Sequence, residues 1–405
     1  MAAQSRVRVT GPLAPFASGF SDELVRLGYT SFSSRLQLQL MAHLSRWLAS
    51  EGLAAAVLTP AAVERFLAAR CAAGYAHHRT SKGLEPLLGY LRGVRAVPVA
   101  APMVAATPVE ALLGRYRRYL LVERGLTEAT ARGYLDVVRP FLVGRASAAP
   151  VEMAGLTAAE VSAYVVAACR EPHGRGGSAK LMVTGLRSLL DFLHVDGVLA
   201  ESLTAAVPSV AGWRLAGLPR ALEPGQVRLL LGSCDRRTAH GRRDFAILTL
   251  LARLGLRRAE VARLELDQID WRAGEIVVDG KGDRRERLPL PADVGEAVAA
   301  YLRRGRPRSA AGRSVFVRVK APHRPLTPGG VTNVVIAAGR RAGLGPITAH
   351  RLRHTAATEL LRAGAPLEEI GQLLRHRRPL TTAIYAKVDR EPLRSLARPW
   401  PGGAA

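Results

Sequence analysis

The order of hydrophobic and polar positions predicts a chain that is mostly helical. Between residues 108 and 205, apolar residues return every three or four positions, which is the spacing of one face of an α-helix. One such face consists of Tyr134, Val137, Val138 and Phe141. Thr157 and Glu160 form a Thr-x-x-Glu capping box, a signal that a helix begins. We therefore expect four or five short helices in this stretch.

The segment before residue 97 repeats this pattern. Gly28-Tyr29-Thr30 matches Gly125-Leu126-Thr127, and Leu58-Thr59-Pro60 matches Leu156-Thr157-Ala158. Further matches follow in the same order, at offsets that drift only from about 97 to about 102 residues. Chance similarity between helices rich in Ala and Leu is the alternative. The ordered series of matches favours duplication of a small helical domain.

After residue 219 the pattern predicts strands as well as helices. A buried helix is predicted from Phe245 and ends near Gly255, and the chain after Pro346 is predicted to be helical again. Two strands with a tight turn between them predict a β-hairpin. They are Glu275–Asp279 and Glu286–Leu290, joined by Gly280–Asp283, with Ser314–Val317 as a candidate third strand.

The expected fold class is mainly α, with one or two small helical domains followed by a mixed α/β, mostly helical domain that contains a small antiparallel sheet. Stretches that contain Pro and Ala separate the domains. The expected parts are an N-terminal helical domain (1–96), a linker (97–107), a second helical domain (108–205), a linker (206–218) and a C-terminal domain with a tail (219–405).

Charge then points to a polyanionic partner. The 58 Lys and Arg residues exceed the 33 Asp and Glu residues by 25, and most of this excess lies after residue 210. A GC-rich genome would explain the preference for Arg over Lys, but not the sign of the charge. Because cations that neutralise phosphates release condensed counterions, nucleic acid is the natural partner.

Composition also indicates the cellular compartment in which the protein works. Three scattered cysteines are too few for a disulfide framework or a zinc site, which indicates a reducing compartment. The first ten residues lack the apolar core of a signal peptide, and the longest largely apolar run contains three prolines. We expect a cytoplasmic protein, associated with the nucleoid, that does not enter a membrane.

Arg257 and Lys281 are the first residues with candidate chemistry. Glu260, three positions after Arg257, is placed to brace that arginine in a phosphate site. Lys281 is one of only five lysines and lies on the Gly-flanked turn of the hairpin. Unlike arginine, lysine can release a proton near neutral pH, as a general acid must. Taken alone, Arg257 is better explained as an ordinary surface arginine, and Lys281 is equally well explained as a solvated lysine in a turn.

A second cluster of candidate residues lies near the C-terminus. His350, Arg353 and His354 share one helical face, which sets imidazoles that exchange protons beside a guanidinium suited to phosphate. His376 and Tyr385 follow. Only ~0.1% of a free tyrosine is phenolate at pH 7, so attack by Tyr385 needs a base or a cationic pocket. The alternatives are a tyrosine packed in the core and a metal site, although no carboxylates or cysteines cluster here.

The order of four motifs carries more information than any one of them. They are Gly-Leu-Arg-x-x-Glu around Arg257, Gly-Lys-Gly at Lys281, His-x-Leu-Arg-His from His350, and His-x8-Tyr ending at Tyr385. Together they resemble the tyrosine recombinase (phage integrase) family. The resemblance is strong over residues 220–390. It is moderate over 108–205, which is similar to the family's SAM-like, core-binding helical domain.

The resemblance implies an enzyme that transfers DNA strands. Tyr385 would attack the scissile phosphate and form a 3′-phosphotyrosyl link with a free 5′-hydroxyl. Arg257 and Arg353 would hold the non-bridging oxygens, and Lys281 would protonate the departing 5′-oxygen.

The remaining residues would move protons and support the site. The resemblance implies that His350 acts in proton transfer with the tyrosine and that His376 hydrogen-bonds the phosphate. Glu260 and His354 would support these residues without contacting the phosphate. Because the phosphotyrosine conserves the bond energy, the resemblance implies no ATP, no metal and no other cofactor.

The implied partners are double-stranded DNA with specific recombination sites and further copies of the chain. The copies would form a tetramer through the C-terminal tail, together with accessory recombinases, and the enzyme would belong to a bacterial mobile element. Residues 108–205 and 215–400 would form a C-shaped clamp on DNA. Residues 15–95 would read additional DNA, with contact to a neighbouring protomer as the alternative.

Two other functions remain open from the sequence. One is a DNA-binding protein that kept the fold and lost catalysis, and the other is a type IB topoisomerase. The intact set of site residues counts against the first, and the duplicated helical domains and the 20-residue tail count against the second. Three residues differ from the family pattern: Leu254, Ala349 and Arg375, the last at a position that is usually glycine. We expect all three to lie next to the catalytic residues and to take no part in the reaction.

Overall fold

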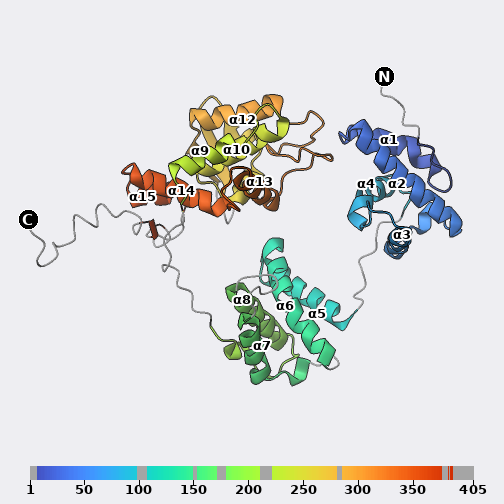
Figure 1. Ribbon diagram of the computed structural model, residues 1–405. Helices are drawn as coiled ribbons and strands as arrows, with labels where there is room; N and C mark the ends of the chain where they lie inside the picture. Colours follow the sequence, from blue (N-terminus) through green and yellow to red (C-terminus); the bar gives the residue numbers. More distant parts are fainter. Residues whose placement is uncertain are drawn as a thin grey trace, which may run out of the picture. The chain divides into compact units, whose positions relative to one another are not determined.

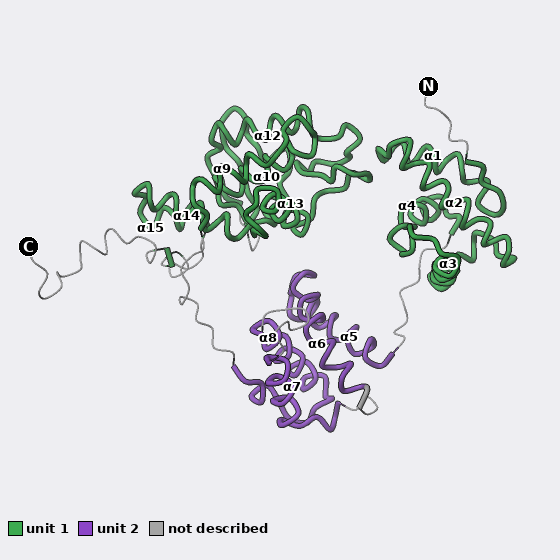
Figure 2. The backbone as a smooth tube through the Cα atoms, in the orientation of Figure 1, with its two compact units in different colours: residues 1–99, 215–405 green, residues 100–214 purple. Residues whose placement is uncertain are grey.

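The computed structural model is mainly helical with one small antiparallel sheet, which confirms the expected fold class (Figure 1). The chain divides into two compact units, residues 100–214 and residues 1–99 with 215–405 (Figure 2). Within the part of the chain that is described, no helix has the length and apolar character needed to cross a membrane. The described residues are 7–97, 107–148, 153–170, 179–209, 221–280 and 285–375, together with Thr382, Ile384 and Tyr385.

Residues 7–97 form four α-helices around one apolar core. The core includes Phe20, Met41 and Leu87, all fully buried. Thr30 caps the longest helix, since its side chain accepts a hydrogen bond from the backbone N–H of Ser33. The elements are η1 (Ala14–Phe16), α1 (Ala17–Arg26), α2 (Ser31–Ser50), η2 (Ala55–Val57), α3 (Pro60–Ala72) and α4 (Ser81–Gly93).

Residues 107–209 form a second group of four α-helices with a core of their own. The predicted capping box is present: the Glu160 carboxylate accepts from the Thr157 N–H at 2.8 Å, and Thr157 Oγ1 accepts from the Glu160 N–H at 3.3 Å. The elements are α5 (Pro108–Arg118), the π-helical turn η3 (Tyr119–Glu123), α6 (Glu128–Ala148), η4 (Met153–Gly155), α7 (Ala158–Arg170), α8 (Ala179–Val195) and η5 (Thr204–Ala206).

The four α-helices of each group follow one another in a similar order. Gly28 and Gly125, 97 residues apart in the sequence, both have positive φ angles (82° and 56°) just before the long helix of each group. Each long helix is followed by a short 3₁₀ turn and by a 13-residue helix, α3 in one group and α7 in the other. The fourth helices differ, because α8 has 17 residues and α4 has 13. The duplication of a small helical domain stays a prediction.

Residues 221–375 surround the buried helix α10, which contacts α9, α11, α12, α13 and α14 (Figure 1). Its residues Ile247, Leu250 and Leu251 are fully buried in the largest hydrophobic cluster of the chain's described part. The predicted helix ahead of Gly255 is therefore confirmed. The helices are α9 (Pro224–Gly232), α10 (Ala239–Arg253), α11 (Arg258–Arg263), η6 (Leu266–Gln268), α12 (Ala292–Arg304), α13 (Pro328–Arg341), α14 (Ala349–Arg362) and α15 (Leu367–Leu373).

The sheet contains the predicted hairpin and a different third strand. The three antiparallel strands lie in the order β1 (Ile269–Asp270), β2 (Glu275–Asp279) and β3 (Arg285–Pro289). The candidate third strand Ser314–Val317 was wrong, since only isolated bridges form there, from Ser314 to Glu265 and from Val317 to Pro325. Val315, Phe316 and Val317 are fully buried and pair with loops, so their apolar run reflects the core.

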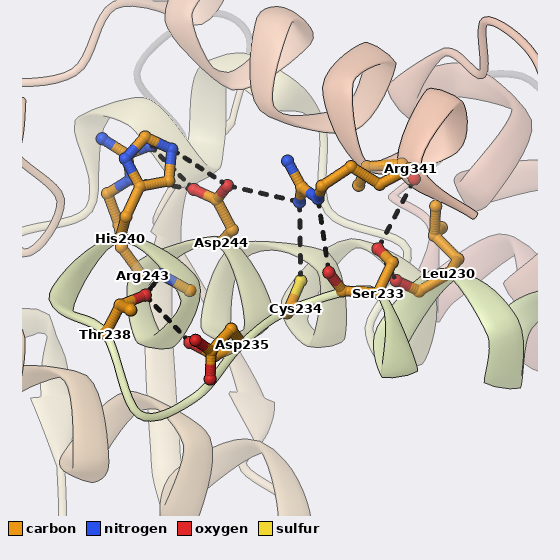
Figure 3. A network of polar contacts seen from close by, with 11 residues as sticks. Leu230, Ser233, Cys234, Asp235, Thr238, His240, Arg243, Asp244 and Arg341 are labelled. Atoms are coloured by element: carbon orange, nitrogen blue, oxygen red, sulfur yellow. Dashed lines mark hydrogen bonds and ion pairs between the residues drawn. The ribbon is translucent and has the colours of Figure 1, made fainter. Parts of the chain in front are cut away.

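A buried carboxylate ties three helices of this domain together (Figure 3). Asp244 on α10 is 1% exposed, and its carboxylate accepts a hydrogen bond from Arg243 Nη2 at 2.7 Å. His240 Nε2 and Arg341 Nη2 lie 3.4 and 3.6 Å from its second oxygen. Arg341, the last residue of α13, also donates to the carbonyl oxygen of Ser233 at the end of α9. The network holds α9, α10 and α13 in place around the core.

Candidate active site

Arg257 is held at a sharp turn between two helices. Gly255 has a φ of +56°, and a Cβ atom there would lie 2.6 Å from the Leu374 side chain, so both the backbone and the space require glycine. Leu256 is fully buried, and Arg257 then occupies the N-cap position of α11. The turn therefore directs the Arg257 side chain toward the residues that follow α15.

Glu260 braces this arginine, as the sequence predicts. Its side chain is 3% exposed, and its carboxylate accepts from the Arg257 backbone N–H at 2.7 Å and from Arg257 Nη1 at 2.6 Å. Arg257 Nη2 donates to the carbonyl oxygen of Arg375 at 3.0 Å. With 38% of its side chain exposed, Arg257 is fixed in orientation and still reaches solvent.

Arg353 is buried beneath the same turn. It lies on α14, is 4% exposed, and donates from Nη1 to the Gly255 carbonyl oxygen at 2.6 Å and from Nη2 to the Leu374 carbonyl oxygen. Burial, together with the cations of Arg257 and Arg375, lowers the pKa of Arg353 to about 10. The guanidinium stays charged at neutral pH, so the site is positive.

Arg375 contributes to the framework of the site, which the sequence did not predict. Its Nη2 donates to Glu260 Oε2 at 2.6 Å, in an ion pair whose side chains are 2% and 3% exposed. Arg375 shares the Glu260 carboxylate with Arg257, so it lies directly beside a candidate site residue, and the expectation that it takes no part in the chemistry stays a prediction. Its φ of +54° is unusual for a residue that is not glycine. A sequence signal did exist: an arginine where the family pattern favours glycine.

Tyr385 lies in a small apolar cluster next to α14. The residue is 2% exposed and packs with Ala357, Ile370 and Leu374. Its hydroxyl oxygen lies 2.9 Å from His354 Nδ1, a hydrogen-bonding distance. Burial raises the pKa of the Tyr385 phenol, and the charge of Arg353 opposes that effect.

The two histidines of α14 lie in contact with each other. The ring centroids of His350 and His354 are 4.3 Å apart with an edge-on interplanar angle of 69°. Burial and neighbouring cations lower the pKa of both imidazoles, to about 4 for His354. Both are therefore neutral at pH 7, and a neutral imidazole can accept a proton.

The structure thus brings Arg257, Glu260, Arg353, His354 and Tyr385 together, with His350 beside them. Lys281 and His376 lie outside the described residues. The chain is described on both sides of Lys281, where Asp279 pairs with Arg285 in the hairpin, and up to Arg375 directly before His376. Among the described residues, no group of three or more His, Cys, Asp or Glu side chains could hold a metal ion.

Comparison with known proteins identifies the family. The model of the phage integrase family matches residues 220–391. An integrase/recombinase of Sinorhizobium fredii is 42% identical over 402 residues, which cover 97% of this chain and 96% of the relative. The chain belongs to the phage integrase family. Tyrosine recombinase XerD of Listeria monocytogenes is 30% identical over 292 residues, covering 70% of this chain and 96% of that recombinase.

A solved structure shows the same fold for this tyrosine recombinase. The XerH site-specific recombinase, in a post-cleavage complex with its palindromic difH substrate, matches with a TM-score of 0.58 at 18% sequence identity. The match covers 74% of this chain and 98% of XerH. Family membership indicates that the chain acts as a site-specific recombinase on DNA.

Proposed function

We propose that this recombinase cuts and rejoins DNA through a 3′-phosphotyrosyl intermediate formed by Tyr385. The observation that carries the proposal is the buried Tyr385 hydroxyl, in hydrogen-bond contact with His354 and close enough to Arg353 for the arginine's charge to affect the phenol pKa. A phenol next to a proton acceptor and a fixed cation is the arrangement that nucleophilic attack on a phosphodiester needs.

Arg257 and Arg353 would hold the non-bridging oxygens of the scissile phosphate. Each guanidinium carries five N–H donors, and the hydrogen bonds described above occupy only some of them. Because these bonds fix both planes before DNA arrives, little reorganisation is needed when charge builds up on the phosphate oxygens. The carboxylate of Glu260 keeps Arg257 in this orientation without neutralising the whole site.

Two further residues complete the proposed mechanism. Lys281 would protonate the departing 5′-oxygen, and His376 would hydrogen-bond the phosphate. The hairpin that carries Lys281 is supported by the pairing of β2 with β3. No cofactor is required by these steps, since the phosphotyrosine conserves the energy of the broken bond.

The proposed substrate is double-stranded DNA that carries specific recombination sites of a bacterial mobile element, within the nucleoid. Similarity to the Sinorhizobium integrase/recombinase, and a fold shared with XerH in complex with its DNA substrate, support this proposal. We propose further that residues 108–205 and 215–400 clamp the DNA and that residues 15–95, as a duplicated helical domain, contact additional DNA. Tetramers would form through the tail after Tyr385, with accessory recombinases in addition.

The test is to trap a covalent complex on the element's own end sequences. Duplex DNA with a nick close to the cleavage site releases a short fragment on attack, so the protein–DNA adduct accumulates and migrates slowly in a denaturing gel. We expect wild-type protein to form the adduct and Tyr385→Phe to form none. An adduct with the Phe variant would show that the nucleophile is a different residue. A wild-type protein that binds the DNA without forming an adduct would favour a silent DNA-binding protein.

A further inference from the structure

Arg375 closes a ring of contacts behind Arg257. Arg257 Nη1 donates to Glu260 Oε1 at 2.6 Å, and Arg375 Nη2 donates to Glu260 Oε2 at 2.6 Å. The ring is completed by the Arg375 carbonyl oxygen, which accepts from Arg257 Nη2 at 3.0 Å. Both the side chain and the backbone of Arg375 therefore hold the pair that Arg257 forms with Glu260.

This ring fixes the direction in which the Arg257 guanidinium points. A guanidinium is planar, so hydrogen bonds from both of its Nη atoms to fixed acceptors leave it little freedom to rotate. The side chains of Glu260 and Arg375 are suitable anchors because they are 3% and 2% exposed, whereas that of Arg257 is 38% exposed. The ring uses two of the five N–H donors of Arg257, so donors remain for a phosphate oxygen.

The charge of Arg375 has a second effect. One carboxylate, that of Glu260, is shared by two guanidinium groups. In a pair with Arg257 alone, its negative charge would cancel much of the positive charge that a phosphate meets. Because arginine stays protonated in proteins, Arg375 offsets the carboxylate and leaves Arg257 positive. Burial, Arg257 and Arg375 together lower the pKa of Arg353, so the charge of Arg375 also acts on the second arginine of the proposed phosphate site.

We propose that Arg375 is a positioning residue for the scissile phosphate. It holds Arg257 in line with one non-bridging oxygen and keeps the charge of Arg257 available to that oxygen. Arg375 acts through Glu260 and through its own carbonyl oxygen, and it contacts neither the DNA nor the reacting atoms. The inference rests on the proposed function, in which Arg257 holds a non-bridging oxygen.

The decisive substitution is Arg375→Gly. Glycine adopts a φ of +54° readily, so the variant keeps the turn and its carbonyl oxygen and loses only the side chain. With saturating nicked DNA, adduct formation should slow by about 10²-fold, the size of effect that a small misplacement of a catalytic group produces. The affinity for DNA should stay the same, because a side chain that is 2% exposed is not available to DNA.

A substrate of altered charge separates positioning from a merely structural role. A methylphosphonate at the scissile position replaces one non-bridging oxygen by an uncharged methyl group and exists as two diastereomers. In one of them the methyl group takes the place of the oxygen assigned to Arg257, and this isomer is the one whose cleavage Arg257→Ala slows least. Arg375→Gly should slow cleavage of normal DNA but cleave this isomer at close to the wild-type rate. A folding defect would slow both substrates by the same factor.

Arg341→Ala is the matched control. It also removes an arginine from beside a buried carboxylate of the same domain, that of Asp244, and it should not distinguish the two substrates. Arg375→Lys keeps the charge and should retain more of the rate on normal DNA than Arg375→Gly. If the glycine variant unfolds, Arg375→Gln replaces it, since glutamine removes the charge, keeps a donor and should show the same dependence on the substrate.

Three results would overturn the proposal. They are a wild-type rate of Arg375→Gly on normal DNA, equal slowing of this variant on normal DNA and on the methylphosphonate isomer, and the same substrate dependence in Arg341→Ala. Failure of the proposed function has a different signature. Tyr385→Phe would then still form the adduct, or Arg257→Ala would slow cleavage of normal DNA and of both isomers by the same factor.

Discussion

Replacing Glu260 by glutamine should destabilise the domain that carries the site. The carboxylate accepts hydrogen bonds from Arg257 and Arg375, and the side chains of Glu260 and Arg375 are 3% and 2% exposed. Glutamine keeps one acceptor but removes the charge and turns an N–H₂ group toward two cations. Removing one partner of a buried ion pair costs about 3–5 kcal/mol, because the other charge is left without compensation.

The lower end of this range applies to Glu260→Gln, since Arg257 is partly exposed and can be solvated. We expect the free energy of unfolding to fall by about 3 kcal/mol. A domain of 150–250 residues loses about 2–4 °C in Tm per kcal/mol, so the unfolding transition should move down by about 6–12 °C. Thermal and urea unfolding of the full chain, followed by circular dichroism, measure both quantities.

Glu286→Gln is the matched control. Glu286 Oε2 lies 3.9 Å from Arg375 Nε, and the Glu286 side chain is 37% exposed. A partly solvated pair at this distance contributes at most about 1 kcal/mol. If Glu260→Gln and Glu286→Gln lose the same small amount of unfolding free energy, the Glu260 carboxylate does not hold Arg257 and Arg375 in place, and the reasoning is refuted.

Three further predictions concern other parts of the domain. Asp244→Asn leaves Arg243 and Arg341 without their buried anion, and urea unfolding should show a loss of about 3 kcal/mol. Lys281→Ala should slow cleavage of normal DNA but affect much less a substrate with a 5′-thiolate leaving group, which needs no proton. His354 has a pKa of about 4 in the fold and an ordinary value near 6.5 when unfolded, so the unfolded chain binds the extra proton first. The shift would give about 3 kcal/mol by pH 4 for a fully buried group, and solvent screening of the partly exposed imidazole reduces this, so His354 should contribute a fall in stability of about 2 kcal/mol from pH 7 to pH 4. Urea unfolding of His354→Gln should show a smaller fall over the same range.

Local sequence signals predicted the helices and the hairpin well. The Thr157–Glu160 capping box and the glycines of the tight turns act through neighbouring residues, so their effect is visible in the sequence. The segment Ser314–Val317 failed because an apolar run shows burial without showing which backbone will pair with it. Its partners, Glu265 and Pro325, are set by the tertiary fold.

For the site, the sequence indicated which residues lie close together but not which of their side chains are in contact. His350 and His354 are four residues apart on one helix, so spacing alone does not tell which imidazole meets the tyrosine. The position of Tyr385 against α14 decides this, and Tyr385 packs there in a cluster with Ala357, Ile370 and Leu374. The role of Arg375 was missed for a related reason: the sequence shows an arginine where the family pattern favours glycine, but it does not show that the partner of this arginine lies 115 residues earlier.

The short turn at Leu374 and Arg375 links the parts of the site. Arg353 donates to the carbonyl oxygen of Leu374, Arg257 donates to that of Arg375, and the Arg375 side chain returns to Glu260. The two arginines proposed to grip the phosphate therefore also fix the backbone directly ahead of His376. Removing either arginine would release this turn as well as a phosphate contact, so single substitutions overstate what each contributes to phosphate binding. Only a double-mutant cycle separates the two effects, since residues that share a partner do not act additively.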